Sequence, residues 1–125
     1  MEQQELLFVL TQGPEDPDRA RFALNAALVA ASSGLAVTLY LALRAAHWAC
    51  AAHDGDSHHA ELRDLVDQVR AAGGVVECCS ACLERHCALP GARHEQPSQL
   101  ENGVRMSGLA SLVRRASTGA QTITF

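Results

Sequence analysis

Lysine is absent from this 125-residue chain, and aromatic residues make up only 4% of it. All ten basic residues are arginines, and only Arg114 and Arg115 stand next to each other. Proteins that bind nucleic acid usually concentrate basic charge in a patch or stripe, often with aromatic residues between the charges. The scattered arginines and the formal net charge of −4 therefore argue against a nucleic-acid partner.

Long apolar runs are equally scarce. The runs at residues 6–10 and 35–43 are both far shorter than the ~20 residues of a membrane-spanning helix. The chain begins with Met1 and Glu2, whereas a secretory signal begins with basic residues. We therefore expect a cytoplasmic protein that does not associate with a membrane, in a compartment where thiols are kept reduced.

Hydrophobic residues nevertheless make up 48% of the chain, which is enough for the core of one domain of this length. With so few aromatic rings, that core must consist mainly of Ala, Leu and Val, which suits helices packed on a sheet. Short strand-like runs alternate with stretches of helical periodicity. The expected strands are residues 5–11, 35–43, 75–78, 104–106 and 121–125.

Helix signals lie between these strand-like runs. Asp16 suits the start of the first helix and Gly34 its exit. The second helix is expected to exit at Gly73, a short helix to follow Cys82, and Ser107 to cap the last one. The apolar residues expected at helical spacing on the first and last helices are Phe22, Ala26, Ala27, Ala30, Leu109, Leu112, Val113 and Ala116.

Repeated alternation of strand and helix predicts an α/β fold. We expect a single domain over residues 1–125, with a five-stranded, mainly parallel sheet and helices on both faces. In open sheets of this kind the functional loops follow the carboxyl ends of the strands.

The cysteines are the chemically informative residues. Four of the five lie between Cys78 and Cys87, an odd and clustered set that argues against a disulfide scaffold in a reducing compartment. Cys78, Cys79 and Cys82 fall at the end of the third strand, where unpaired N–H groups and the following helix favour thiolate. Such a thiolate can attack a sulfane sulfur and carry it as a persulfide, or Cys79 and Cys82 can close into a disulfide.

Several neighbours are expected to support or modify this chemistry. Arg85 and His86 lie about one helical turn beyond Cys82 and can add positive charge, and Gly13 lies at the same edge of the sheet. The ambiguous segment 44–50 is compatible with a short helix. In that case His47 and Trp48 either line a pocket by the cysteines or simply pack.

Other arrangements of the same residues are open. The cysteines could be small apolar residues that fill a strand end and a helix face. Cys79, Cys82, His86 and Cys87 could together bind zinc, although structural zinc usually joins two separated ligand pairs.

Remaining polar signals favour no further site. His58 and His59, beside Asp54 and Asp56, suit a solvated helix start better than a metal site. The loop at Gly13 lacks a nucleotide-binding glycine pattern, and no G-x-S-x-G hydrolase motif is present.

Three segments of the chain, taken together, resemble the DsrE/DsrF-like family. They are FVLTQGPEDPDRARFALNAALVAASSGLAVTLYLAL near the start, GGVVECCSACLERH in the middle and LENGVRMSGLASLVRRASTGAQTITF at the end. The resemblance covers nearly the whole chain and implies a five-stranded parallel sheet of the DsrE/YchN-like kind. It also implies a homo-oligomer, commonly a trimer or hexamer, that exchanges sulfur with donor and acceptor proteins.

The resemblance implies a role for the cysteines in two different alignments. In branches that relay sulfur, the acceptor cysteine precedes an Arg-Arg-Gly, and by that spacing it matches Cys78, with residues 84–86 (ERH) in place of Arg-Arg-Gly. Other branches carry C-x-x-C-L followed by Arg-Gly, which matches Cys79 and Cys82, with the spacing to Arg85 one residue short. The identity of the acceptor therefore stays open.

The sequence thus predicts a small sulfur-relay or thiol-redox protein. It would act as a sulfurtransferase or sulfur carrier through Cys78, Cys79 and Cys82, without a cofactor. The alternative is a non-catalytic subunit of an oligomeric assembly, because the alanine-rich helices and modest charge also suit broad helix interfaces. A zinc-binding module is the third hypothesis.

Overall fold

Five parallel strands form the centre of the structure, in the spatial order β4-β3-β2-β1-β5. The computed structural model describes residues 4–50, 57–87 and 103–125, and for residues 57–59 the backbone alone. The strands are β1 (Glu5–Leu10), β2 (Ala36–Leu41), β3 (Val75–Cys79), β4 (Arg105–Ser107) and β5 (Gln121–Thr124). The helices are α1 (Pro17–Ser32), the 3-10 helix η1 (Leu43–Ala49), α2 (Ser57–Ala71), α3 (Ser80–His86) and α4 (Leu109–Ser117). The expected α/β fold with its parallel sheet is confirmed.

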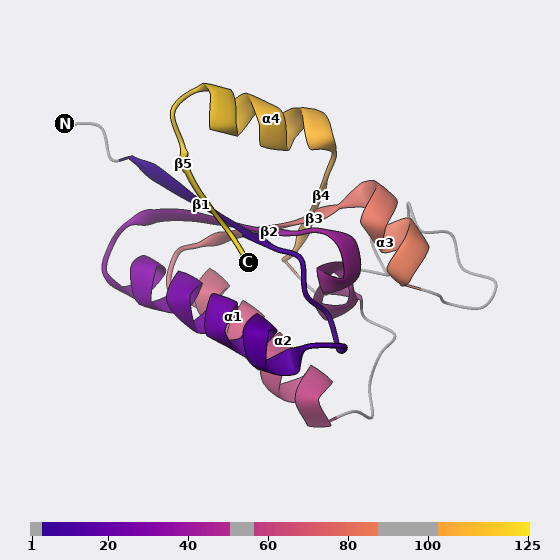
Figure 1. Ribbon diagram of the computed structural model, residues 1–125. Coiled ribbons are helices and arrows are strands. Elements are labelled where there is room, and N and C mark those ends of the chain that lie inside the picture. Colours follow the sequence, from indigo (N-terminus) through magenta and orange to yellow (C-terminus); the bar gives the residue numbers. More distant parts are fainter. Residues whose placement is uncertain (1–3, 51–56, 88–102) are drawn as a thin grey trace.

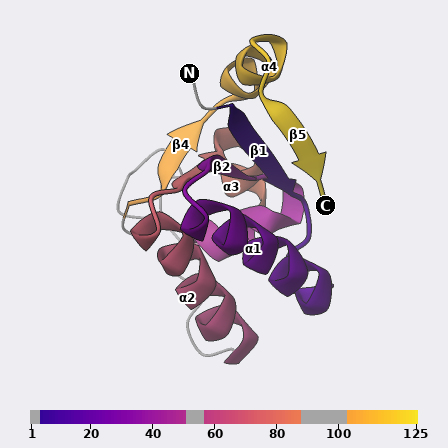
Figure 2. The same ribbon diagram turned by 90° about the vertical axis from the view of Figure 1, so that its left-hand side faces the viewer.

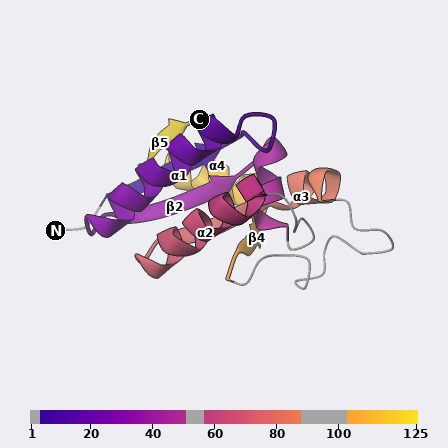
Figure 3. The same cartoon turned by 90° about the horizontal axis from the view of Figure 1, so that it is seen from below.

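One face of the sheet is covered by α1 and α2, which lie side by side (Figure 3). The Asp16 carboxylate accepts a hydrogen bond from the Arg19 N–H at 3.1 Å, which begins α1 where the sequence predicts. Gly34 takes a φ of 86° after the helix, a left-handed conformation that favours glycine. Beneath the two helices lies the main apolar core.

The two faces of the sheet differ in polarity because successive residues of a strand point to opposite sides. Apolar side chains from β1, β2 and β3 fill the core beneath α1 and α2; they are Phe8, Leu10, Val37, Leu39, Leu41, Val76 and Cys78. A much smaller cluster lies on the other face, formed by Leu7, Val9, Tyr40 and Cys79. The buried polar residues Thr38 and Glu77 lie on this same face, two residues before Tyr40 on β2 and two residues before Cys79 on β3.

Of the described helices, α4 alone covers this second face, as Figure 1 shows above the sheet and Figure 2 shows end-on. Leu112 packs on the small cluster, and Arg115 makes an ion pair with Glu77 at 2.7 Å. No residue of α4 is buried, so the prediction that its apolar side faces inward is wrong for most of that side. Leu109 and Val113 are 62% and 63% exposed. Helical periodicity gave the helix correctly but could not show that the sheet reaches only part of it.

Three smaller predictions also need correction. Phe22 is on α1 but is 69% exposed, since α1 meets the sheet through its alanines and Leu24. The residue that caps α4 is Gly108, with no side-chain hydrogen bond, and Ser107 is the last residue of β4. The helix α3 begins at Ser80 and therefore includes Cys82, rather than following it. Within the described ranges, no helix is long and apolar enough to cross a membrane.

Candidate functional site

The cysteine cluster lies at the carboxyl edge of the sheet, where β3 passes into α3. Cys78 pairs in register with Leu41 of β2, and Cys79 with Ser107 of β4. Cys79 is both the last residue of β3 and the cap of α3. Because side chains alternate along a strand, Cys78 joins the main core, whereas Cys79 joins the small cluster under α4.

Cys78 is placed as a packing residue. Its side chain is fully buried among apolar groups, and its sulfur is 3.6 Å from the carbonyl oxygen of Cys79. Burial raises the pKa of the Cys78 thiol well above its ordinary value, and the charges of Cys79 and Cys82 raise it further. At neutral pH this sulfur is a thiol and not an attacking thiolate.

Cys79, one residue further, has the opposite chemistry. Burial alone would raise the pKa of its thiol, but four hydrogen-bond donors outweigh that effect and lower it. The donors are the backbone N–H and the thiol of Cys82, the hydroxyl of Tyr40 and the backbone N–H of Ala81. Two of the four are backbone N–H groups in the first turn of α3, which have no partner within the helix. Cys79 is therefore the thiol of the cluster whose pKa is lowered, although the residue is only 3% exposed.

Cys82 is the outer thiol of the C-x-x-C pair, partly exposed in the first turn of α3. Its pKa is raised, first by burial and then by its hydrogen bond to Cys79. The backbone N–H of Leu43 and the charge of Arg85 act in the opposite direction. Leu43 has a φ of 53°, a left-handed conformation that costs energy for a residue other than glycine. Strained backbone at a hydrogen bond to Cys82 is typical of a functional site.

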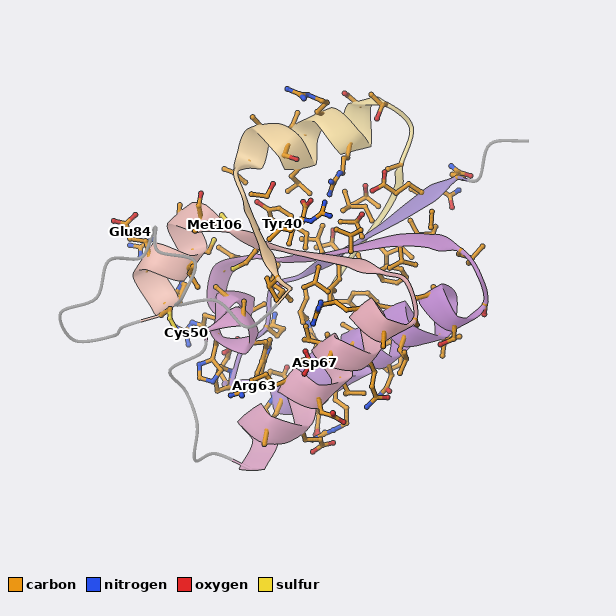
Figure 4. The ribbon with its side chains drawn as sticks, turned by 180° about the vertical axis from the view of Figure 1, so that it is seen from behind. Tyr40, Cys50, Arg63, Asp67, Glu84 and Met106 are labelled. Carbon is orange, nitrogen blue, oxygen red and sulfur yellow. A yellow bond between two sulfur atoms is a disulfide. The ribbon has the colours of Figure 1, made fainter. Side chains whose placement is uncertain are left out.

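Tyr40 contributes the donor that sequence reasoning missed. Its side chain is fully buried on β2, and Figure 4 places it between the sheet and α4. The hydroxyl is 3.3 Å from the Ser107 carbonyl oxygen and is also within hydrogen-bond reach of the Cys79 sulfur, so these two acceptors compete for its one proton. Burial and then Cys79 raise the pKa of Tyr40, so the phenol keeps its proton and can donate it in a hydrogen bond. The one sequence signal for this donor is a tyrosine near the end of the expected strand at residues 35–43.

The three supporting residues predicted from the sequence lie at this edge but differ in role. Arg85 is exposed on α3 and lowers the pKa of Cys82 through its charge. His86 lines a cavity that it shares with residues of η1 and of the loop after β1. Gly13 packs on η1, where a Cβ would collide with the carbonyl oxygen of Arg44, so only glycine allows this close approach.

A disulfide between Cys50 and Cys87 was not expected, because the sequence argued for reduced thiols. It joins the residue after η1 to the residue that ends α3, and both half-cystines are fully buried. Figure 4 shows Cys50 where η1 meets the end of α3. Cys50 lies far from the cysteine cluster in sequence, and nothing in its spacing indicates this partner.

The bond also bears on the zinc hypothesis. Cys87 is bonded to Cys50 and is not free to act as a fourth ligand with Cys79, Cys82 and His86. Among the described residues, no group of three or more His, Cys, Asp or Glu side chains is arranged to hold a metal ion. The predictions for Asp54, Asp56, His58 and His59 lie outside the described side chains.

Comparison with known proteins gives a family and a fold. The family model described as the DsrE/DsrF-like family matches residues 4–125. The crystal structure of the YchN protein from E. coli is similar, with a TM-score of 0.76 and 19% sequence identity. That match covers 99% of this chain and 100% of the YchN chain. No curated protein matches the sequence significantly.

Proposed function

Because the chain belongs to the DsrE/DsrF-like family, we propose that it is a small sulfur-relay or thiol-redox protein whose sulfur acceptor is Cys79. One observation carries the choice: four donors stabilise the Cys79 thiolate, whereas burial keeps Cys78 protonated. The two cysteines are adjacent in sequence, and only one of them has the chemistry of a nucleophile.

The same surroundings serve both halves of a relay. In the loading step, the Cys79 thiolate attacks the outer sulfur of a donor persulfide, a new S–S bond forms, and the donor leaves as a thiolate. In the delivery step, an acceptor thiolate attacks the outer sulfur on Cys79, which itself leaves as a thiolate. Hydrogen bonds that lower the pKa of Cys79 make it the better leaving group in this second step.

Cys82 decides between persulfide and disulfide chemistry. Attack of its thiolate on the inner sulfur of a Cys79 persulfide would form a Cys79–Cys82 disulfide and release hydrosulfide. Since the pKa of Cys82 is raised, it is mostly protonated at neutral pH, which favours survival of the persulfide. At alkaline pH a larger fraction of Cys82 is thiolate, so formation of the Cys79–Cys82 disulfide becomes faster.

We expect donor and acceptor proteins and a cytoplasmic location, as is typical of the family. We also expect a homo-oligomer, a trimer or hexamer. The apolar residues Leu109 and Val113, exposed on α4, support an interface on that helix. Light scattering on Leu109→Glu should then show smaller species than the wild type, whereas an unchanged mass would exclude α4 from the interface.

The test of the relay is intact-mass spectrometry before and after a persulfide donor. We expect a gain of one sulfur atom that a reductant reverses. Cys79→Ser should abolish the gain, whereas Cys78→Ala, which removes the neighbouring thiol, should retain it. A sulfur gain that persists in Cys79→Ser would reject Cys79 as the acceptor, and no gain in the wild type would reject the relay.

The second candidate function is a non-catalytic assembly subunit. The slight exposure of Cys79 favours it, because a partner must reach a sulfur that is almost covered. A variant with Cys78→Ala, Cys79→Ser and Cys82→Ser would then keep its oligomeric state and its partners, while the relay predicts loss of sulfur transfer.

A further inference from the structure

A cavity of about 310 Å³ lies at the carboxyl edge of the sheet, lined by Pro14, Glu15, Arg44, His47 and His86. We propose that it binds the amino-acid head group of a low-molecular-weight thiol or persulfide and directs the sulfur of that compound toward Cys79 and Cys82. The inference rests on the proposed sulfur chemistry and names the chemical class of one donor.

The cavity has three walls that are tied to one another. The loop after β1 is held on η1 by a hydrogen bond from Trp48 Nε1 to the Gln12 carbonyl oxygen, at 2.8 Å. The close contact between Gly13 and Arg44 fixes the same two segments. At the other side, the Cys50–Cys87 disulfide fastens η1 to the end of α3. A site with walls fixed in this way loses little entropy when a ligand binds.

Two of the lining residues, His86 and Arg44, lie near Cys82 on the helices that carry them. His86 follows Cys82 by four residues on α3, so both side chains lie on one side of that helix. On η1, Arg44 follows Leu43, whose N–H is hydrogen-bonded to the Cys82 sulfur. On α3 and on η1, a residue that lines the cavity is thus close to Cys82, and the Cys82 thiol donates a hydrogen bond to Cys79.

The lining groups suit a zwitterion. The Arg44 guanidinium can bind a carboxylate through charge-assisted hydrogen bonds, and within the described residues it forms no ion pair. The Glu15 carboxylate, which accepts the Gly13 N–H at 2.9 Å, offers the opposite charge to an ammonium group. The two imidazoles add hydrogen-bonding groups between them. A volume of about 310 Å³ is at the lower end of small-molecule sites, which suits an amino acid.

Calorimetry with S-methyl-L-cysteine tests the site without any thiol exchange, since this probe has the amino-acid head group but no free thiol. We expect the wild type to bind it, and Arg44→Gln and Glu15→Gln each to weaken binding roughly tenfold or more, as loss of a charged hydrogen bond predicts. Arg114→Gln and Glu84→Gln, which make the same charge changes at exposed positions outside the cavity, should stay within about twofold of the wild type.

A second probe separates the two charges. Because 3-(methylthio)propanoate lacks the ammonium group, Arg44→Gln should weaken its binding while Glu15→Gln should not. No binding of S-methyl-L-cysteine by the wild type, or equal effects of Glu15→Gln on both probes, would overturn the proposal. Cys79→Ser should bind the probe normally, because Cys79 does not line the cavity. If the wild type binds the probe but gains no sulfur from a persulfide donor, the relay alone is rejected. If it gains sulfur but does not bind the probe, the cavity proposal alone is rejected.

Discussion

At the scale of single residues, Cys78 and Cys79 show how different the surroundings of two adjacent residues in a strand can be. One side chain enters a core of aliphatic groups and the other meets four hydrogen-bond donors, although their backbones differ by one position. The pKa of one thiol rises and that of the other falls for this reason. The reactivity of each cysteine at this edge of the sheet therefore depends on the face to which its side chain points as well as on its residue type.

Tyr40 is the donor to Cys79 that can be removed with the least change in shape. In Tyr40→Phe the ring remains in the small cluster but the hydroxyl is lost. We therefore expect the pKa of Cys79 to rise, because its thiolate loses one of the hydrogen bonds that stabilise it. The pH profile of Cys79 alkylation by iodoacetamide, read by peptide mass spectrometry, should move to higher pH. The rate at pH 7 should fall accordingly.

A structural effect of Tyr40→Phe would look different. Loss of the hydrogen bond to Ser107 could loosen β4 and would then lower the melting temperature and expose Cys78 to alkylation as well. An alkylation profile of Cys79 that stays at the wild-type pH would show that the tyrosine hydroxyl does not stabilise the thiolate.

Sequence reasoning proposed the three cysteines as the site but could not choose among them. The spacing of Cys79 and Cys82 and their place after a strand are local signals, which a sequence contains. The donor on Tyr40 lies 39 positions before Cys79, and the Leu43 N–H that meets Cys82 lies equally far away. Such contacts depend on how β2 and β3 pair, and that register is not written in either segment alone.

At the scale of elements, α4 is attached to the sheet mainly by polar contacts. It contributes Leu112 to the small cluster but no buried residue. Arg115 instead reaches Glu77, which is almost fully buried, at 2.7 Å, and Glu5 at 3.7 Å. The helix was predicted correctly from its periodicity, whereas its exposed apolar side was not, because a hydrophobic stripe indicates burial against something without naming the partner.

Removing the Arg115 guanidinium should therefore destabilise the protein. In Arg115→Met, Glu77 is left buried without its cation, and we expect the free energy of unfolding to fall by about 2–3 kcal/mol, less than for a fully buried pair because Arg115 is partly exposed. Urea unfolding measures the change. The double variant Glu77→Met/Arg115→Met should recover most of the loss, since neither charge is then buried alone. If the double variant is as unstable as the single one, the ion pair is not what holds α4.

At the scale of the whole molecule, two kinds of connection meet at the carboxyl edge of the sheet. Strand pairing places the ends of β1, β2 and β3 together, and the Cys50–Cys87 bond fastens η1 and α3 over them. The alternating pattern of the sequence was sufficient for the first connection, because each strand and helix carries its own local signal. It was not sufficient for the second, because a bond between residues 37 positions apart has no periodicity to reveal it.

The disulfide should therefore matter most for global stability. In the chain-entropy account, a link across 37 residues restricts the unfolded chain enough to stabilise the fold by roughly 4 kcal/mol. Both half-cystines are buried, which protects the bond from soluble thiols until the structure opens. Urea unfolding with a dithiol reductant should show a loss of about this size, and the Cys50→Ala/Cys87→Ala variant should start from the lowered value. Because that variant has no such bond left to break, the reductant should not destabilise it further; a second loss of equal size would place the effect at Cys79 and Cys82 instead.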